Sequence, residues 1–327
     1  MARTSARLGT QALKQTLRTG SAPRKGQAAA LASQGDWVPG LAMAPTGVRR
    51  YHLFKPPGVQ FNERLPLVVM LHGCGQDAKS FALSTRMNRL AARERFFVLY
   101  PEQDRRAHPH GCWNWYGTRT HAAHGEAAVI MAAIDQVCLL YPVDPARVVI
   151  AGMSAGASMA ALLVTRYPQR FKAVAMHSGV PPGTANSSAS ALVAMRGRAT
   201  AEALSTSTVW PPLLVIHGAR DAIVDARNAR ASAKLWADAA GPHAEKSRRV
   251  GRGKRHPMTV TDFKVRGGIT VATLCEVDEL AHAWSGGDAR QSHSDARGPD
   301  ASRLIWSFAQ RQFTARARRP TSGSDDV

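Results

Sequence analysis

The residues best suited to chemistry are GMSAG at positions 152–156, in which a serine stands between two glycines. The β-branched run at 148–150 precedes them and predicts a strand, and the run at 157–164 favours a helix that ends before Pro168. A serine on a sharp strand-to-helix turn is exposed for attack, and small neighbours are needed because the flanking backbones pack closely. We therefore predict Ser154 as a nucleophile; the alternative is an ordinary turn that contains a serine.

A serine nucleophile needs a base, and the base needs a carboxylate that fixes its tautomer. His282 follows the last predicted strand, and Asp221 follows the strand that ends at residue 216. The order Ser, Asp, His is that of an α/β-hydrolase triad. Asp225 and His293 are the competing acid and base, and Asp221 has the alternative role of capping the next helix.

Acyl transfer also needs two N–H donors for the developing oxyanion. Ala155, directly after Ser154, offers one at the start of a predicted helix. The HGCG segment after the strand at 67–71 offers the N–H of Cys74, and its glycines let the backbone approach an oxygen closely. The alternative is an ordinary turn after a strand.

Short apolar runs alternate with helix-like segments, which predicts an α/β fold with a mostly parallel sheet covered by helices on both faces. We expect strands at 49–54 (an edge strand), 67–71, 96–100, 148–151, 173–176 and 213–216, and a hairpin-like ending at 260–277. We expect helices at 80–94, 125–141, 157–167, 226–240 and 300–312, and a flexible excursion over the sheet at 183–209.

The 327 residues, 44% of them hydrophobic, suffice for one large domain. We expect a basic, flexible arm at 1–40, an α/β-hydrolase catalytic domain at 41–315 and a tail at 316–327. A net charge of +20 is typical of proteins that bind nucleic acid, so nucleic acid must be considered as a partner. The charges fall in the arm, the tail and the segment 246–255, which we take as a loop, without a nucleic-acid motif, so we expect solvated positive surface and no specific nucleic acid.

No apolar run approaches the roughly 20 residues of a membrane span, and the first residues lack the apolar segment of a secretory signal. We therefore expect a cytoplasmic protein with no membrane span. The four cysteines match no zinc spacing, and we expect no metal and no cofactor. Cys138 and Cys275 are expected core thiols. Cys74 and Cys112 lie in glycine-containing loops that could meet; a reducing cytoplasm argues against a disulfide, and the pairing stays open.

Segments of this chain between about residues 48 and 313 resemble, in family order, the polyhydroxybutyrate depolymerase family of esterases: LHGCGQDAKSFA, YPEQ, GCWNW, GEAAVI, IAGMSAGASMAALL, FKAVAMHSGVP, IHGARDAIV, RGKRHPMTVTDF and HAWSGGDARQSHSDARGPDASRLIW. The resemblance implies an α/β-hydrolase fold and a serine esterase with Ser154, Asp221 and His282 as triad. It also implies that the Cys74 loop supplies an oxyanion donor.

The resemblance implies a polyester or small ester substrate, and we expect short-chain 3-hydroxyacyl esters, polymeric or oligomeric. The alternatives are a carbohydrate esterase acting on feruloyl or acetyl esters, and a non-catalytic protein that binds granules or polyanions. The chain looks more like the intracellular members. The basic arm has two interpretations: a flexible, solvated segment, or a segment that contacts the surface of a polymer granule. Trp113 and Trp115 are expected substrate-binding residues, one ring lining the site and the other packing as core.

Overall fold

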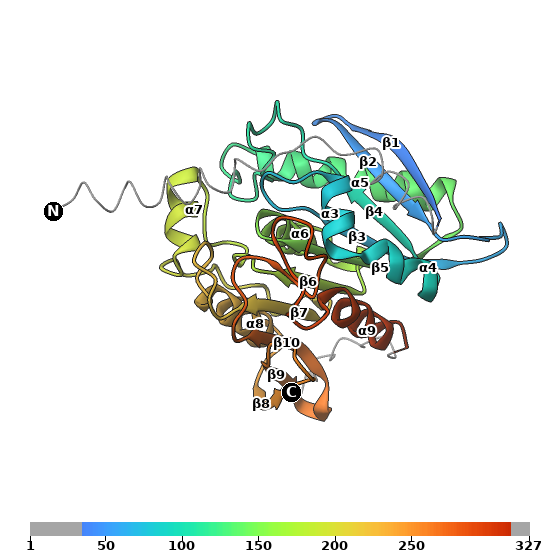
Figure 1. Ribbon diagram of the computed structural model, residues 1–327. Helices are drawn as coiled ribbons and strands as arrows, with labels where there is room; N and C mark the ends of the chain where they lie inside the picture. Colours follow the sequence, from blue (N-terminus) through green and yellow to red (C-terminus); the bar gives the residue numbers. More distant parts are fainter. Residues whose placement is uncertain (1–34, 315–327) are drawn as a thin grey trace, which may run out of the picture.

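Ten strands form the central sheet of the computed structural model, which describes residues 35–314 (Figure 1). Their order across the sheet is β1-β2-β4-β3-β5-β6-β7-β10-β9-β8. The strands are β1 Asp36–Ala44, β2 Gly47–Lys55, β3 Leu65–Leu71, β4 Phe97–Pro101, β5 Val143–Met153, β6 Ala173–His177, β7 Leu213–Gly218, β8 His243–Val250, β9 Met258–Val265 and β10 Thr270–Val277. Two short strands, β11 Trp284–Ser285 and β12 Ser294–Asp295, pair separately.

The strands in the middle of the sheet run parallel, and the two edges are antiparallel. Parallel ladders join β4 to β3, β3 to β5, β5 to β6, β6 to β7 and β7 to β10. The carboxyl ends of these strands therefore meet at one edge of the sheet, where ligand sites form in open α/β sheets.

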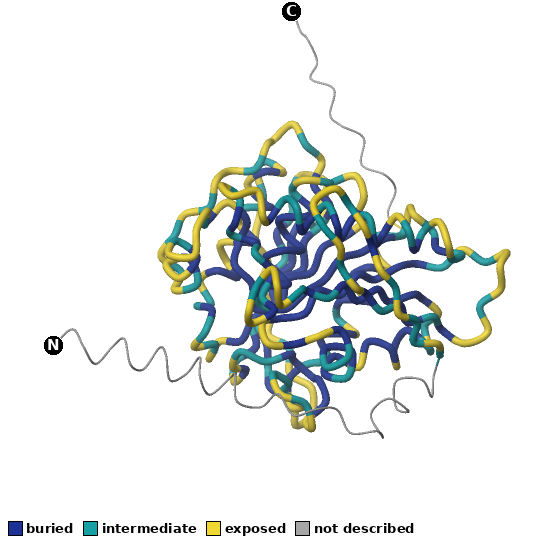
Figure 2. Tube along the Cα trace, turned by 90° about the horizontal axis from the view of Figure 1, so that it is seen from above, coloured by how far each residue is buried: buried dark blue, intermediate teal, exposed yellow. Residues whose placement is uncertain are grey.

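Helices cover both faces of the sheet (Figure 1). They are α3 Ala78–Thr85, α4 Met87–Glu94, α5 Ala122–Leu140, α6 Ala155–Arg166, α7 Ser188–Met195, α8 Arg227–Ala239 and α9 Ala301–Thr314. One core contains buried residues of α5, α6 and α8, and the other contains buried residues of α3, α4 and α9. The strands between them are buried on both sides, as Figure 2 shows for the centre of the molecule.

The alternation of side chains along β3 joins the two cores. Leu67 and Val69 belong to the core with α5 and α6, whereas Val68 and Met70 belong to the core with α3 and α9. All four are fully buried, and each such side chain contributes about 1.5–3 kcal/mol relative to exposure. A strand buried on both faces needs a continuous apolar run, which is why these runs predicted the sheet. The predicted α/β fold is confirmed.

Helix α5 has the length and apolar composition of a bilayer-crossing helix, and it is the one such helix within residues 35–314. Its buried residues include Ala127, Ile130 and Ile134, and they belong to the core against the sheet. A half-buried core helix passes the same test of length and composition, so this feature follows from its place in the fold.

Several predicted boundaries need correction. Strand β1 begins at Asp36, so residues 36–40 belong to the sheet rather than to the predicted arm. Strand β1 is also the edge, and β2, predicted as an edge strand, lies between β1 and β4. The alternation in β1 was missed because Pro39 and Gly40 interrupt it, and an edge strand tolerates such residues. Residues 1–34 of the predicted arm at 1–40 and the predicted tail at 316–327 lie outside the described residues.

Three internal segments also differ from the prediction. The helix predicted at 80–94 is two helices, α3 and α4, because Arg86 adopts a left-handed conformation with φ of 56°. The excursion at 183–209 contains α7. Part of the basic segment 246–255 is strand β8, at the other edge of the sheet, where exposed charged side chains discourage pairing with another chain.

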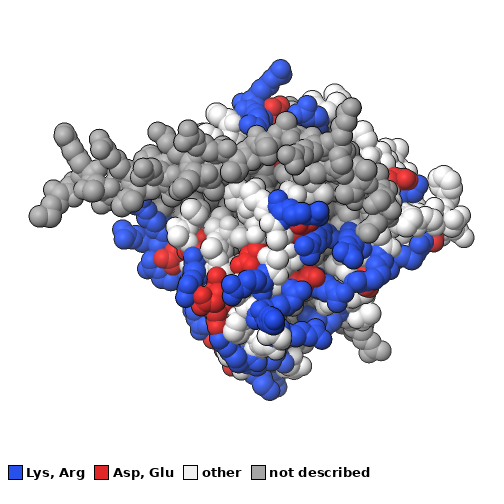
Figure 3. Space-filling model, in the orientation of Figure 1, with Lys and Arg blue, Asp and Glu red and all other residues white. Residues whose placement is uncertain are grey.

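Positive charge is spread over the surface together with acidic side chains. Figure 3 shows Lys and Arg over much of one face with Asp and Glu between them. Arg248 of β8 pairs with Asp262 of β9, and Arg249 of β8 pairs with Asp278, which follows β10. Part of this charge is thus neutralised locally.

Candidate active site

Ser154 lies on the turn between β5 and α6, where its φ is 55° and its ψ is −122°. A non-glycine residue rarely adopts a positive φ, and such a conformation costs about 1–3 kcal/mol unless its surroundings enforce it. Here the backbone N–H of Ser154 donates to the carbonyl of His177, 2.8 Å away at the end of β6. The neighbouring strand thus helps to hold the turn that presents the serine.

The two glycines of the pentapeptide are required by close backbone packing. A Cβ added to Gly152 would lie 2.3 Å from the carbonyl oxygen of Gly156. A Cβ added to Gly156 would lie 2.2 Å from the carbonyl oxygen of Leu71 at the end of β3. These positions admit no side chain, which is the reason that the motif has glycine at both.

The loops after β7 and β10 bring Asp221 and His282 together. Asp221 Oδ2 lies 2.8 Å from Nδ1 of His282, and Oδ1 accepts the backbone N–H groups of Ile223 and Val224, each at 2.9 Å. Burial of the Asp221 side chain opposes its ionisation, but the hydrogen bond and charge of His282 outweigh burial and lower the pKa of the carboxyl. The carboxylate therefore holds the proton on Nδ1, which leaves Nε2 of His282 able to accept one.

The competing acid and base occupy other positions. Asp225 forms an ion pair with Arg227 and accepts the Arg227 backbone N–H at 2.9 Å, and these interactions lower its pKa to about 2. His293 lines the same cavity as His282, but its Nδ1 is buried with no hydrogen-bond partner among residues 35–314. A base without an orienting acceptor has no fixed tautomer, so the geometry favours His282.

Ser154 and His282 line one cavity, yet no hydrogen bond joins the Ser154 hydroxyl to the imidazole within the described part of the chain. Without substrate, catalytic hydrogen bonds are often long and tighten only when the substrate binds. The arrangement therefore brings the three predicted triad residues to one site with the Asp–His bond formed.

The segment after β3 borders the nucleophile. An added Cβ on Gly73 would lie 3.6 Å from Cβ of Ser154. The Gly73 N–H donates to Oε1 of Gln76 at 3.0 Å, and the Gly75 N–H donates to the carbonyl of His110 at 2.9 Å. The remaining N–H of this loop, on Cys74, has no acceptor among residues 35–314.

The N–H of Ala155, at the start of α6, likewise has no acceptor within the region that the structure describes. A helix start concentrates positive partial charge, which favours a developing oxyanion there. The Cys74 and Ala155 N–H groups are thus unoccupied donors, as the predicted oxyanion hole requires.

Cys74 and Cys112 form a disulfide, with their Cα atoms 4.3 Å apart. The pairing that the sequence left open is therefore present in the structure. The bond links the loop after β3 to the GCWNW loop, 38 residues further along the chain. Cys74 is exposed and Cys112 is half-buried, and both line the cavity.

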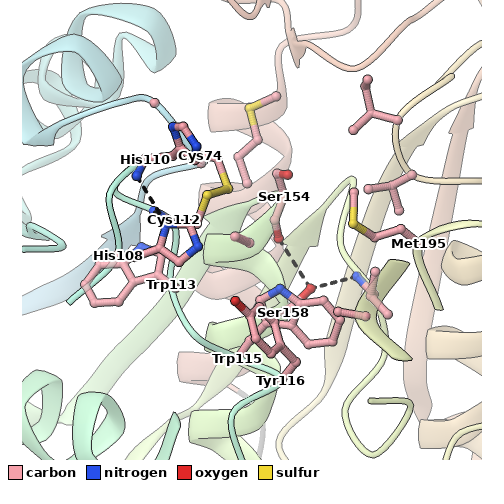
Figure 4. A pocket seen from close by; sticks show the side chains of 18 of the residues that line it. Cys74, His108, His110, Cys112, Trp113, Trp115, Tyr116, Ser154, Ser158 and Met195 are labelled. Atoms are coloured by element: carbon pink, nitrogen blue, oxygen red, sulfur yellow. Dashed lines mark hydrogen bonds between the residues drawn. A yellow bond between two sulfur atoms is a disulfide. The ribbon is translucent and has the colours of Figure 1, made fainter. Parts of the chain in front are cut away.

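The cavity beside Ser154 has a volume of about 350 Å³ and a largely apolar wall. Figure 4 shows the disulfide and Trp113 on one side of Ser154 and Met195 of α7 on the other. Trp113 and Trp115 both line it, although Trp113 is fully buried and its Nε1–H donates to the carbonyl of His72 at 3.1 Å. The rest of the apolar wall comes chiefly from Met153, Ala155, Val180, Ala191, Leu192, Ile223 and Val224.

Two buried histidines that the sequence did not single out support the site. His177 Nε2 accepts the N–H of Ser285 at 3.1 Å, and its ring stacks on Trp284, so it ties the Ser154 turn to the His282 loop. Burial lowers the pKa of His177 to about 3. His72 donates from Nδ1 to the Gly73 carbonyl, and burial also lowers its pKa. Both stand at strand ends, which is the one signal that the sequence offered.

Comparison with known proteins places this chain among esterases. The family model described as esterase PHB depolymerase matches residues 49–256. The chain is 36% identical over 142 residues to poly(3-hydroxyalkanoate) depolymerase C of Paucimonas lemoignei, covering 43% of this chain and 33% of that protein. It is 28% identical over 215 residues to feruloyl esterase B of Neurospora crassa, covering 60% of this chain and 72% of that protein.

Among solved structures, acetyl xylan esterase from Aspergillus awamori matches with a TM-score of 0.58 and 18% identity, covering 76% of this chain and 94% of that one. At this identity the likeness concerns the fold. The chain spans a third of the depolymerase that it matches. The chain belongs to the esterase PHB depolymerase family, a family of carboxylic ester hydrolases, and has the α/β-hydrolase fold.

Proposed function

We propose that this protein is a serine esterase that hydrolyses short-chain 3-hydroxyacyl esters, polyhydroxybutyrate or its oligomers, through an acyl-enzyme on Ser154. One observation carries the proposal. His282, hydrogen-bonded to the buried Asp221, lines a single, largely apolar cavity together with Ser154 and with Cys74 and Ala155, whose N–H groups are unoccupied donors. This combination is what acyl transfer requires.

In the proposed reaction, Oγ of Ser154 forms a bond to the ester carbonyl carbon while its proton passes to Nε2 of His282. The carbonyl oxygen gains negative charge, which the N–H groups of Cys74 and Ala155 stabilise. His282 then gives its proton to the leaving alcohol as the C–O bond breaks. Asp221 stays ionised, as its lowered pKa allows, and stabilises the imidazolium.

Water completes the cycle by the same steps. His282 removes a proton from water, the hydroxide oxygen attacks the acyl carbon, and Ser154 leaves with the proton returned by His282. These steps need no further group, since the described side chains supply the nucleophile, the base and the acid that orients it.

A carbohydrate esterase acting on feruloyl or acetyl esters is the second candidate. The match to feruloyl esterase B covers more of this chain than the match to the depolymerase. The cavity wall also carries Trp113, Trp115 and Tyr116, and aromatic rings could pack against a feruloyl ring. The apolar wall of Met153, Val180 and Leu192 suits the methyl groups of hydroxybutyrate equally.

A substrate panel separates the two candidates. The values of kcat/KM should be measured for 3-hydroxybutyrate oligomers, amorphous polymer, p-nitrophenyl butyrate, methyl ferulate and acetylated xylan. We expect the hydroxybutyrate oligomers to have the highest kcat/KM, and Ser154→Ala to abolish every activity and labelling by a serine-directed phosphonate. A higher kcat/KM for methyl ferulate or acetylated xylan would assign the protein to the second candidate, and an unlabelled, inactive wild type would remove both.

We also propose that the basic segment before β1 contacts the surface of a polymer granule, which is an apolar surface with anionic groups. Since β1 begins at Asp36, a deletion should end at residue 34. We expect the deletion variant to keep its kcat on p-nitrophenyl butyrate and to lose co-sedimentation with granules. Equal co-sedimentation of both proteins would remove this proposal and leave the esterase proposal unaffected.

The cytoplasmic location stays a prediction. The Cys74–Cys112 disulfide favours a location in an oxidising compartment instead, because disulfides form and persist there. Cell fractionation combined with alkylation of free thiols before lysis would decide between the two.

A further inference from the structure

Three segments meet in one buried cluster behind the oxyanion loop, through residues that have no assigned role in the reaction. They are YPEQ, GCWNW and GEAAVI, and the residues that meet are Gln103, Asn114 and Glu126. Gln103 follows β4, Asn114 lies in the loop before α5, and Glu126 lies in the first turns of α5. Gln103 is 5% exposed and Glu126 is 4% exposed.

Glu126 accepts hydrogen bonds at both carboxylate oxygens. Oε2 accepts the backbone N–H of Asn114 at 2.8 Å, and Oε1 accepts the side-chain amides of Asn114 and Gln103, each at 2.6 Å. Arg49 of β2 lies 3.6 Å from Oε1 and supplies the opposite charge. A buried carboxylate is costly unless it is paired and hydrogen-bonded, so this one is stable only when residue 114 occupies its present position.

Gln103 connects the same cluster to the oxyanion loop. Its backbone N–H donates to Nε2 of His72 at 3.1 Å, and its side-chain amide donates to the carbonyl of Cys112 at 3.0 Å. Its Oε1 accepts Nε of Arg49, also at 3.0 Å. Because Oε1 and the amide are both engaged, the side chain has one orientation.

The cluster therefore reaches Cys74 along two routes. On one side, Gln103 holds His72, two residues before Cys74. On the other side, Glu126 and Gln103 hold residues 112 and 114, and Cys112 is bonded to Cys74 through the disulfide. Trp113 links the two routes, because it follows Cys112 and its Nε1–H donates to the carbonyl of His72 at 3.1 Å.

We propose that Glu126 and Gln103 are positioning residues that hold the N–H of Cys74 in place in the oxyanion hole. The inference rests on the proposed esterase function, because the oxyanion hole that these residues would position belongs to that reaction. Neither residue lines the cavity itself. Their loss should therefore affect stabilisation of the tetrahedral state and leave binding of the ground-state ester unchanged.

The test is Glu126→Gln, which keeps the size of the side chain and replaces one oxygen by an amide. Each carboxylate oxygen faces an N–H donor, so the new amide meets a donor at either position. We expect kcat on p-nitrophenyl butyrate to fall about 10- to 100-fold with KM unchanged, as for a misplaced catalytic group. The affinity for an alkylboronic acid, which forms a tetrahedral anion on Ser154, should fall by the same factor as kcat/KM.

Asp135→Asn is the matched control. It removes a carboxylate from the same helix, but Asp135 is exposed and pairs with Arg170 at the surface. We expect unchanged kcat, KM and boronate affinity. A wild type that hydrolyses no ester and binds no boronate would refute the proposed function. An active wild type together with a Glu126→Gln variant of equal kcat and boronate affinity would refute only the positioning role.

Asn114→Ala decides the matter if Glu126→Gln does not fold. It removes one hydrogen bond to Oε1 and keeps the backbone contact to Oε2. We expect a smaller fall in kcat, again matched by the boronate affinity, with the disulfide intact and two free thiols, Cys138 and Cys275, on titration after unfolding. A variant with a raised KM but with unchanged kcat and unchanged boronate affinity would show that the cluster has a merely structural role. That result would overturn the proposal.

Discussion

The Nδ1 atom of His282 lies 2.8 Å from Oδ2 of Asp221, although 61 residues separate the two in the sequence. Asp225, four residues beyond Asp221, is paired with Arg227 instead. We expect Asp221→Asn to lower kcat about 10⁴-fold, because an amide stabilises the wrong imidazole tautomer. Asp225→Asn should leave kcat within about threefold, since exposed ion pairs contribute little. Steady-state kinetics on p-nitrophenyl butyrate checks both, and the reverse ranking would assign Asp225 as the acid.

Stability should fall with pH below 6.5 through His177. Burial lowers the pKa of this imidazole from 6.5 to about 3, so between these values the unfolded chain binds a proton that the folded protein does not. Its contribution is fully present above pH 6.5 and is lost as the pH falls toward 3, at up to about 1.4 kcal/mol per pH unit.

His177→Gln isolates this contribution, since its amide oxygen can still accept the Ser285 N–H. Urea unfolding at several pH values between 6.5 and 4 should show a shallower decline for the variant, by about one proton. Parallel curves for variant and wild type would contradict the assignment.

Gly156→Ala should destabilise the protein by about 1–3 kcal/mol or prevent folding, although alanine is the better helix former. The reason is the 2.2 Å distance from an added Cβ to the Leu71 carbonyl oxygen. The matched control is Gly251→Ala, where an added Cβ meets no atom within 4 Å. Chemical denaturation of the two variants provides the comparison, and equal free energies of unfolding would show that the β3–α6 contact is looser than described.

Cys112→Ala should lower both stability and activity. Loss of a disulfide that closes a loop of 38 residues costs about 2–4 kcal/mol, and the Cys74 N–H loses one of its anchors. Cys138→Ala is the control, because Cys138 is a free thiol whose pKa burial raises to about 11. Thermal unfolding and kcat should separate the variants, and a Cys112→Ala enzyme with wild-type kcat would show that the disulfide does not position the donor.

Local patterns in the chain were sufficient to predict the α/β fold and the Ser154 turn. The parallel strands are buried on both faces, so each appears as an uninterrupted apolar run, as at 67–71 and 148–150. The glycines at 152 and 156 mark close backbone contacts that leave no space for a side chain. Strands β1 and β8 lie at the edges and are largely exposed, which allows Pro39 in one and Arg248 in the other, and the prediction missed them.

Tertiary structure decided the choices between residues of the same type. Asp221 and Asp225 stand four residues apart after the same strand, and only the position of the His282 loop distinguishes them. The same holds for the Cys74–Cys112 pairing and for the Gln103–Asn114–Glu126 cluster, whose members come from three segments. Sequence by itself determined which residue types stand at the ends of which strands, because burial and turn geometry are local. Which of them touch was decided by the packing of loops from different strands, since hydrogen bonds depend on distances that no local pattern encodes.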